Sequence, residues 1–576
     1  MRKSGAEILI DALIQEKAEV IFGYPGGVVI PIFDALYDCR KLRVVLVRHE
    51  QAAAHAADGY ARATGKVGVC LATSGPGATN LVTGIATAYL DSIPMVAITG
   101  QVSRPLLGTD AFQEADVVGI TRPVTKHNIL VQSIEELPRR LREAFHIAST
   151  GRPGPVLVDI PVDISRGHLD NYEYPAEVKL RGYRPNVVGH IRQIKKAAEL
   201  IKTAQRPVIF AGGGIILSGA SAELRELAEK INAPVTTSMM GLGGFPGTHP
   251  LFVGMPGMHG SKAANYALQQ TDLIISVGVR FDDRVTGDTS RFAPQAKIIH
   301  MDIDPVTISK VVAVDIPVVG DAKNILGQLN KVVEPRKPNG WNEQVKQWKG
   351  ERLFSYELSD SAIKPQAVVE TLYRLTAGDA IVATEVGQNQ MWTAQYYAFD
   401  KPRQLLSSGG LGTMGYGMPA AMGAAVAYPD RTVVDVAGDG SIQMNIQELA
   451  TISVNRIPVK VVILNNGYLG MVRQWQELFY HKRYSKTCLR EGGPLCEECK
   501  GIQQCTKAYV PDFVALAKAY NIEAFRATKP GEVEATLKAG LAVKGPAVME
   551  FMVVPEENVF PMVPAGKPID QILEAP

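Results

Sequence analysis

Short apolar runs alternate with helical periodicity along most of the chain. In the first third, the runs at residues 44–47, 67–72, 95–99 and 156–160 have the length and composition of buried strands. The segments between them place apolar residues at helical spacing. Because strands that alternate with helices form parallel sheets covered on both faces, we expect a doubly wound α/β domain here.

The alternation recurs twice more and divides the chain into three blocks. Residues 165–190 are polar and poor in strand formers, and residues 334–340 are rich in proline and charge, so both segments are candidate linkers. The first and third blocks look like one architecture used twice. The expected fold class is α/β, with three doubly wound parallel-sheet domains and a C-terminal tail. The expected bounds are residues 1–165, 190–333, 360–550 and 551–576.

Polar residues follow two apolar runs of the third block. Asp439, inside a Gly-Asp-Gly triplet, ends one run, and Asn466 ends the next. Between them, Asn445 and Glu448 have the three-residue spacing of a helix capping pair. Since ligands bind at the C-terminal edge of an open parallel sheet, we expect Asp439 and Asn466 to lie close together at such an edge.

The residue types at this edge suit a metal-bound diphosphate. A carboxylate from Asp439 and an amide oxygen from Asn466 are hard ligands for Mg²⁺, which shares its coordination shell with phosphates. Glycines let the backbone approach a diphosphate, and a helix N-terminus favours its charge. Either motif alone is ordinary turn chemistry, but the pair at this spacing resembles the signature of thiamine diphosphate (ThDP) enzymes.

Glu50 also stands at the end of a strand-like run. Its apolar and Ala-rich flanks favour a crevice over the solvated surface where a lone glutamate usually lies. ThDP chemistry needs one carboxylic acid beside the pyrimidine ring, because a hydrogen bond there stabilises the imino form that removes the C2 proton. We therefore expect Glu50 to serve this cofactor.

Composition narrows the class of protein. Of the 576 residues, 46% are hydrophobic and 20% are charged, with a net charge of +2 and no basic block. This balance disfavours nucleic acid and membrane surfaces as partners. Acidic residues among the first 20 positions disfavour a signal peptide, and the uncharged, Gly- and Ala-rich stretch 404–429 favours tight packing over a membrane span. Six cysteines do not make a disulfide framework in a chain of this length, so a cytoplasmic enzyme is expected.

Longer motifs carry a specific resemblance over nearly the whole chain. They are RHEQAAAHAADGYAR at 48–62, TSGPGATN at 73–80, GTDAFQE at 108–114, GVRFDDRVTG at 278–287, GDGSIQMNIQELAT at 438–451 and LNNGYLGMVRQWQ at 464–476. On these motifs the chain resembles the large catalytic subunits of acetohydroxyacid synthase (acetolactate synthase), a ThDP-dependent family.

The resemblance implies a biosynthetic reaction. Pyruvate is decarboxylated on ThDP, and the hydroxyethyl unit joins a second pyruvate, giving 2-acetolactate, or 2-ketobutyrate, giving 2-aceto-2-hydroxybutyrate, in the first common step of branched-chain amino acid synthesis. Pyruvate oxidase, which uses its flavin for electrons, and catabolic acetolactate synthase, which lacks FAD, are alternatives. The segment Arg280–Arg284 favours the biosynthetic enzyme. An inactive scaffold paralogue is a third alternative, disfavoured by the intact Glu50, Asp439 and Asn466.

The resemblance assigns catalytic and cofactor residues. Glu50 matches the cofactor-activating acid, and Gly27 matches a backbone donor beside the reacting carbonyl. Gln113 and Lys126 match residues on the substrate approach. The implied ThDP contacts, besides Glu50, are Gln388, Asn389, Met414, Gly438, Gly440, Ser441 and Met471.

Substrate and metal residues follow from the same resemblance. Phe112 lines the substrate approach, Arg284 helps to bind the carboxylate of the second 2-keto acid, and Trp475 favours 2-ketobutyrate by packing against its extra methyl, worth about 1–3 kcal/mol. The implied Mg²⁺ ligands are Asp439, Asn466 and the backbone of Tyr468.

The middle block resembles the FAD-binding domain of this family. Gly213 and Gly214 follow a strand-like run, which alone is a weak signal, and no GxGxxG fingerprint is present. The flavin is expected to be structural, because acetolactate formation is not a net redox reaction. The implied FAD contacts are Arg152, Gly213, Gly214, Met258, His259, Gly278, Arg280, Asp302, Asp304 and Asp321.

The resemblance also implies partners. Glu50 and the diphosphate motif lie in different blocks, and in the family they meet across a subunit interface. A homodimer or a dimer of dimers is therefore expected, together with a separate small regulatory subunit.

Two features depart from the family pattern. Asn389 stands where many members carry histidine, so it can still hydrogen-bond the diphosphate but cannot carry charge. Cys488, Cys496, Cys499 and Cys505 cluster within 18 residues. Four thiolates could bind Zn²⁺ or an iron–sulfur cluster, and the alternative is free thiols in a surface loop.

Overall fold

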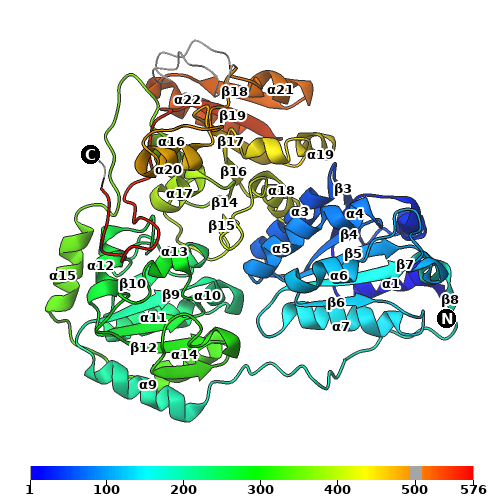
Figure 1. The fold of residues 1–576 in the computed structure, drawn as a ribbon, viewed down its shortest axis with the longest axis horizontal. Coiled ribbons are helices and arrows are strands. Elements are labelled where there is room, and N and C mark those ends of the chain that lie inside the picture. Colours follow the sequence, from blue (N-terminus) through cyan, green and yellow to red (C-terminus); the bar gives the residue numbers. More distant parts are fainter. Residues whose placement is uncertain (1, 492–508, 575–576) are drawn as a thin grey trace.

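The computed structural model describes residues 2–491 and 509–574, and in them the chain forms three parallel sheets, each covered by helices (Figure 1). The predicted α/β class with several parallel-sheet domains is confirmed. Strands β1 (Lys3–Ser4) and β8 (His168–Leu169) add a short antiparallel pair.

The first domain, blue to cyan in Figure 1, is built on a sheet with strand order β3-β2-β4-β5-β7-β6. Its central strands β4, β5 and β7 are buried throughout, as expected for a parallel sheet between two helix layers. The strands are β2 (Val20–Gly23), β3 (Arg43–Leu46), β4 (Gly68–Ala72), β5 (Met95–Gln101), β6 (His127–Leu130) and β7 (Pro155–Pro161). The helices are α1 (Gly5–Gln15), α2 (Ile30–Tyr37), α3 (Glu50–Thr64), α4 (Pro76–Asn80), α5 (Val82–Leu90), α6 (Val117–Thr121), α7 (Leu137–Ser149) and α8 (Val162–Arg166).

The middle domain, green in Figure 1, has the strand order β10-β9-β11-β12-β13. Its strands are β9 (Pro207–Ala211), β10 (Val235–Thr237), β11 (Leu273–Val277), β12 (Lys297–Asp302) and β13 (Ile316–Val319). Its helices are α9 (Ile191–Thr203), α10 (Gly213–Ser218), α11 (Ser221–Ile231), α12 (Lys262–Gln270), α13 (Asp283–Thr286) and α14 (Ala322–Val332). Helix α15 (Gly340–Lys349) follows them and leads out of the domain.

The described part of the third domain forms a sheet with the order β15-β14-β16-β17-β19-β18. By position along the block this is the same order as in the first domain, so one architecture occurs twice, as the sequence suggests. The strands are β14 (Ile381–Thr384), β15 (Leu405–Leu406), β16 (Val433–Gly438), β17 (Val459–Asn465), β18 (Glu523–Ala527) and β19 (Ala547–Met552). The helices are α16 (Pro365–Leu375), α17 (Gln388–Tyr396), α18 (Gly417–Ala427), α19 (Glu448–Val454), α20 (Gly470–Phe479), α21 (Phe513–Ala519) and α22 (Val533–Ala542).

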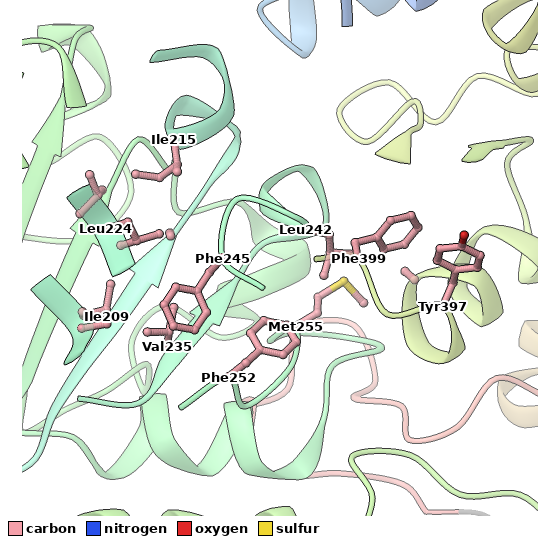
Figure 2. Packing of buried hydrophobic residues seen from close by; sticks show 14 of the residues in the cluster. Ile209, Ile215, Leu224, Val235, Leu242, Phe245, Phe252, Met255, Tyr397 and Phe399 are labelled. Carbon is pink, nitrogen blue, oxygen red and sulfur yellow. The ribbon is translucent and has the colours of Figure 1, made fainter. Parts of the chain in front are cut away.

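A continuous apolar core joins the middle and third domains. Figure 2 shows Phe245, Phe252 and Met255 of the middle domain on one side of this core and Tyr397 and Phe399, which follow α17, on the other. All five side chains are buried. The two domains are therefore held together by the same kind of packing that stabilises each of them.

Helices α3 and α18 bring the first and third domains into direct contact through small residues. A Cβ atom on Gly59 would overlap the carbonyl group of Ala420, and a Cβ on Gly423 would overlap the carbonyl of Ala56. Only glycine allows backbones to approach this closely. The contact is reciprocal, with one glycine from each helix.

Helix α19 begins later than the sequence predicts. A 3₁₀ turn (Ile442–Met444) precedes it, and Asn445 donates its side-chain amide to the carbonyl of Gly415 (2.7 Å) instead of capping the helix. The predicted capping pair is wrong because Glu448 directs its carboxylate to the first domain.

Among the described residues, no helix has the length and apolar character needed to cross a bilayer.

Candidate cofactor site

The ends of β16 and β17 bring Asp439 and Asn466 together. The two strands are parallel neighbours and stay in register to their C-terminal ends. The Gly467 N–H donates to Asp439 Oδ2 (3.1 Å), and the Tyr468 N–H donates to Asn466 Oδ1 (3.0 Å). Both polar side chains therefore belong to one pair of adjoining turns at the C-terminal edge of the sheet, where parallel-sheet geometry predicts them.

The electrostatics of this edge favour a cation. Asp439 is almost fully buried, and burial raises the pKa of its carboxyl from 3.8 to about 7. A buried carboxylate is costly in its ionised form until a positive charge compensates it. Within the described residues, no group of three or more His, Cys, Asp or Glu side chains forms a metal cage. One carboxylate with one amide oxygen fits Mg²⁺, which keeps water and phosphate oxygens in its shell.

Gln388 connects this edge to the start of α17. Asn466 Nδ2 donates to Gln388 Oε1 (3.1 Å), and Gln388 Nε2 donates to Gln474 Oε1 (2.8 Å). A Cβ on Gly470 would overlap the side-chain ends of Gln388 and Asn466, so a larger residue there would displace both side chains. These contacts fix Gln388 beside the proposed metal ligand Asn466.

Asn389, in contrast, is turned into the sheet. Its amide nitrogen donates to the carbonyls of Glu385 (3.0 Å) and Val436 (2.8 Å), while its oxygen lies on the side of Gly438. The oxygens of a diphosphate accept hydrogen bonds and need donors. In this arrangement two carbonyls already take up the amide nitrogen of Asn389, and its contact with a diphosphate stays a prediction.

The turn after β16 brings Gly438, Gly440, Ser441 and Met414 into one region. Ser441 Oγ accepts the Gly438 N–H (3.3 Å) and donates to the Gly438 carbonyl (3.2 Å). A Cβ on Gly440 would lie 4.0 Å from Met414 Cε, so Met414 borders this turn. Met471 lies in the first turn of α20, partly buried against the apolar core.

Glu50 is the first residue of α3, at the C-terminal edge of the first sheet. Its Oε2 accepts a hydrogen bond from Asn80 Nδ2 (3.0 Å), and a Cβ on Gly77 would lie 3.3 Å from its Oε1. Gln113 has a left-handed backbone (φ +59°) and packs against Gly75. Glu50 and Gln113 therefore border the same turn.

Within the described residues, no side-chain contact connects Gly27, Phe112 or Lys126 with Glu50. A Cβ on Gly27 would meet no atom within 4 Å, so the space beside it is open. Phe112 is 88% exposed. The Lys126 ammonium donates to the carbonyls of Ile147 (2.5 Å) and Thr150 (2.6 Å), and burial lowers its pKa to about 8.

Two predicted substrate residues do meet. The Arg284 guanidinium lies 5.9 Å from the centroid of the Trp475 ring, at cation–π distance. The Arg284 carbonyl accepts the Met258 N–H (2.8 Å). Arg284 belongs to α13 of the middle domain and Trp475 to α20 of the third, so the two domains build this contact jointly.

A cavity of about 810 Å³ lies between the first and middle domains. Arg152, Arg280 and Asp304 line it, and Arg152 Nη1 pairs with Asp304 Oδ2 (3.0 Å). Burial raises the pKa of the neighbouring Asp302 to about 6. The volume is that of a small-molecule site, and guanidinium groups suit a diphosphate. The cavity therefore fits a nucleotide cofactor such as FAD.

The other predicted flavin residues surround the C-terminal edge of the middle sheet. A Cβ on Gly214 would lie 2.6 Å from the Cα of Gly278, so the chain segments after β9 and β11 touch there, next to Gly213. Asp321 caps α14 with its carboxylate. His259 is buried, and burial lowers its pKa to about 4, which keeps it neutral.

The clustered cysteines fall mostly beyond the described part of the chain. Cys488 is partly buried and forms an isolated antiparallel bridge with Tyr468. Cys496, Cys499 and Cys505 lie outside the described residues. A metal or cluster role for the four stays a prediction.

Two acidic residues that the sequence analysis overlooked hold the loop carrying Met414. Glu385, buried at the end of β14, accepts the Gly415 N–H (2.6 Å), and Asp91 of the first domain accepts the Gly410 N–H (2.8 Å). Glu385 follows a strand as Asp439 does, so the same rule would have found it. Asp91 carries no comparable signal, because its partner is 319 residues away.

Comparison with known proteins agrees with this geometry. Three family models match in order: the N-terminal TPP binding domain of thiamine pyrophosphate enzymes at residues 3–120, their central domain at 194–329 and their C-terminal TPP binding domain at 385–551. The acetolactate synthase large subunit of Haemophilus influenzae is 48% identical over 99% of this chain and 98% of its own length.

Other relatives extend the match. The acetolactate synthase large subunit of Corynebacterium glutamicum is 50% identical over 98% of this chain and 89% of its own length. The large subunit of acetolactate synthase isozyme 3 of Escherichia coli K12 is 48% identical over 99% of this chain and 98% of its own length. The chain therefore belongs to the family of acetolactate synthase large subunits, which are ThDP-dependent enzymes.

Proposed function

We propose that this chain is the catalytic subunit of a biosynthetic acetolactate synthase. It joins the two-carbon unit left by decarboxylation of pyruvate to a second pyruvate or to 2-ketobutyrate, in the first common step of branched-chain amino acid synthesis. The observation that carries the proposal is the meeting of Asp439 and Asn466 at the ends of neighbouring strands, in a chain whose duplicated sheet presents Glu50 at the corresponding edge.

The residues at the third-domain edge would hold the cofactor. The Asp439 carboxylate and the Asn466 amide oxygen would bind Mg²⁺, together with the backbone of Tyr468. When bound, ThDP supplies an electron sink for the carbon that loses CO₂. The residues that would contact it in this domain are Gln388, Asn389, Met414, Gly438, Gly440, Ser441 and Met471.

The protein's own groups would handle protons and orientation. The Glu50 carboxyl would share a proton with the pyrimidine ring, and the Asn80 amide holds its Oε2 in place. The Gly27 N–H, beside open space, would donate to the developing oxyanion. Arg284 would bind the carboxylate of the second 2-keto acid, and the ring of Trp475, which Arg284 contacts, would pack against the extra methyl of 2-ketobutyrate.

The cavity between the first and middle domains would hold FAD in a structural role. The reaction as a whole transfers no electrons, so a flavin there has no redox step to perform. Arg152 and Arg280 would face its diphosphate, and Asp302 and Asp304 would face its ribose or adenine edge. FAD would then hold the two domains at a fixed distance.

A second copy of the chain is proposed to complete the site. Large apolar side chains stay exposed on both the first and the third domain. They are Tyr24, Ile30 and Phe112 on the first domain and Leu411, Met444 and Val472 on the third. A twofold dimer that pairs the first domain of one chain with the third domain of its partner would cover both sets. A dimer of dimers, a small regulatory subunit and a cytoplasmic location stay predictions.

Product analysis with mixed pyruvate and 2-ketobutyrate tests the proposal. With ThDP and Mg²⁺ the protein should release CO₂ and form both 2-acetolactate and 2-aceto-2-hydroxybutyrate, and without them it should form neither. CO₂ release coupled to flavin reduction, with no carbon–carbon bond formed, would instead indicate a pyruvate oxidase. Product formation by protein stripped of FAD and shown to keep its fold would favour the FAD-free catabolic type. No CO₂ release under any condition would favour an inactive scaffold.

A further inference from the structure

The turn that precedes Glu50 is held by Glu448, a residue of the third domain. Strand β3 ends at Leu46, and Glu50 opens α3, so the residues between them form a tight connection with backbone N–H groups that need acceptors. The N–H groups of Arg48 and His49 both donate to Glu448 Oε1, each at 2.9 Å. A single carboxylate oxygen thus anchors the two residues directly before Glu50.

Glu448 is built for this contact. It is fully buried, and burial raises the pKa of its carboxyl to about 6, which still lies below neutral pH. Its Oε2 accepts the hydroxyl of Thr451 (2.6 Å), and the same hydroxyl lies 3.3 Å from the Leu46 carbonyl, on the other side of the turn. Hydrogen bonds to a charged acceptor are about twice as strong as neutral ones.

Glu448 is also tied to the opposite half of the site. It opens α19, nine residues after Asp439, and Asn445 in the same segment holds the carbonyl of Gly415 beside Met414. The segment that begins at the proposed cation ligand therefore ends at the anchor of the Glu50 turn.

We propose that Glu448 is a positioning residue that fixes Glu50 for proton exchange with ThDP and links it mechanically to the Asp439 turn. The role of Glu50 itself rests on the proposed function. If Glu50 faces the cofactor of a partner chain, the segment from Asp439 to Glu448 joins the two cofactor sites of a dimer.

The first test needs no cofactor. Amide hydrogen exchange of the cofactor-free protein, followed by mass spectrometry on peptides that cover residues 43–52, reports the N–H groups of Arg48 and His49. Glu448→Ala should speed their exchange by at least about tenfold, because the acceptor is lost. Glu448→Gln should retain slow exchange, since its amide oxygen can accept both hydrogen bonds and its NH₂ can donate to Thr451. Equal protection in wild type and Glu448→Ala would overturn the contact.

The second test separates positioning from stability. In protein saturated with ThDP and Mg²⁺, Glu448→Ala should slow deuterium exchange at the thiazolium C2 by about 10–100-fold, as expected for a displaced catalytic acid, with ThDP affinity within twofold of wild type. Glu448→Gln should recover most of the rate. Loss of stability with an unchanged exchange rate per bound cofactor would reduce Glu448 to a structural contact.

One control variant and one substitute variant complete these two tests. Glu143→Ala removes another buried glutamate, held by Arg139 and Arg140 on α7, without touching the Glu50 turn, and should leave C2 exchange unchanged. If Glu448→Ala does not fold, Thr451→Val removes the hydroxyl that spans the turn and should slow exchange by a few-fold; an unchanged rate counts against the proposal. Absent C2 exchange in the wild type would refute the proposed function, while the amide measurement would still decide the contact.

Discussion

Replacing Asp439 with Asn should separate cofactor binding from folding stability. The carboxylate is buried and accepts the Gly467 N–H (3.1 Å), a hydrogen bond that an amide oxygen can also accept. In the cofactor-free protein the change removes a buried negative charge without opening a cavity. In the presence of ThDP and Mg²⁺ it removes the charged ligand of the cation. Asp439→Asn should therefore stabilise the free protein and abolish its stabilisation by cofactor.

The magnitude follows from the pKa of Asp439. Burial raises that pKa from 3.8 to about 7, a difference of about three pH units, each worth about 1.4 kcal/mol. Ionisation of the buried Asp439 side chain therefore lowers the free energy of unfolding by at most about 4 kcal/mol. After relaxation of the surroundings we expect about 2–4 kcal/mol. Because the folded-state pKa is the higher one, the cost is absent below about pH 4, grows between pH 4 and 7, and is complete above pH 7. The advantage of Asn over Asp should follow the same profile.

Thermal unfolding at several pH values measures both effects. At pH 8 without cofactor, Asp439→Asn should raise the Tm of the third domain by roughly 4–16 °C, since about 2–4 kcal/mol at about 2–4 °C per kcal/mol applies to a domain of this size. Saturating ThDP and Mg²⁺ at about 100 times Kd should stabilise the wild type by about 2.7 kcal/mol and the variant by far less. Asp430→Asn, an exposed carboxylate of the same domain, is the matched control. A lower Tm in the free variant would refute the burial argument, and full stabilisation by cofactor would remove Asp439 from the metal site.

Gly59→Ala should lower the free energy of unfolding by about 1–3 kcal/mol, because the new methyl overlaps the Ala420 carbonyl; urea titration measures this, and Gly531→Ala, whose methyl would meet no atom within 4 Å, should cost clearly less. Trp475→Ala should reduce the preference for 2-ketobutyrate over pyruvate by about 1–3 kcal/mol in a product-ratio assay, and an unchanged ratio would exclude Trp475 from acceptor selection. Arg152→Ala should weaken flavin binding in equilibrium dialysis, since it lines the cavity and pairs with an acid there; unaltered affinity would place the flavin elsewhere.

The sheets could be predicted where both faces are buried. Strands β4, β5 and β7 appear as near-continuous apolar runs because helices cover both of their faces. Edge elements lack that signal: β6 contains His127 and Asn128, and β15 is two residues long. The fold class, the inner strands β4, β5 and β7 and the edge strand β3 could therefore be predicted, whereas the buried inner strand β2 and the edge strand β6 were not among the predicted runs.

The residues of the candidate site also differ in whether the sequence alone could predict their positions. Asp439 and Asn466 could be placed because a local rule, a polar residue at a strand end, coincides with the neighbouring positions of β16 and β17. Glu448 could not, since the local capping pattern with Asn445 competes with a contact 400 residues away in sequence, and the buried long-range contact wins. The contacts of Lys126 could not be predicted either, because the acceptors of its ammonium are the carbonyls of Ile147 and Thr150 and the hydroxyl of Tyr183, which carry no local signal. Its role on the substrate approach stays a prediction.

The exchange rate of the C2 proton of bound ThDP, compared between the wild type and Glu50→Gln, decides whether Glu50 activates the cofactor. The account predicts that both proteins bind ThDP and Mg²⁺ with similar affinity, since Asp439 and Asn466 are intact. It also predicts that the variant exchanges the proton about 10²–10⁴-fold more slowly, the usual contribution of a positioned acid. Equal exchange rates at full cofactor occupancy would contradict the assignment of Glu50 as the group that activates the cofactor.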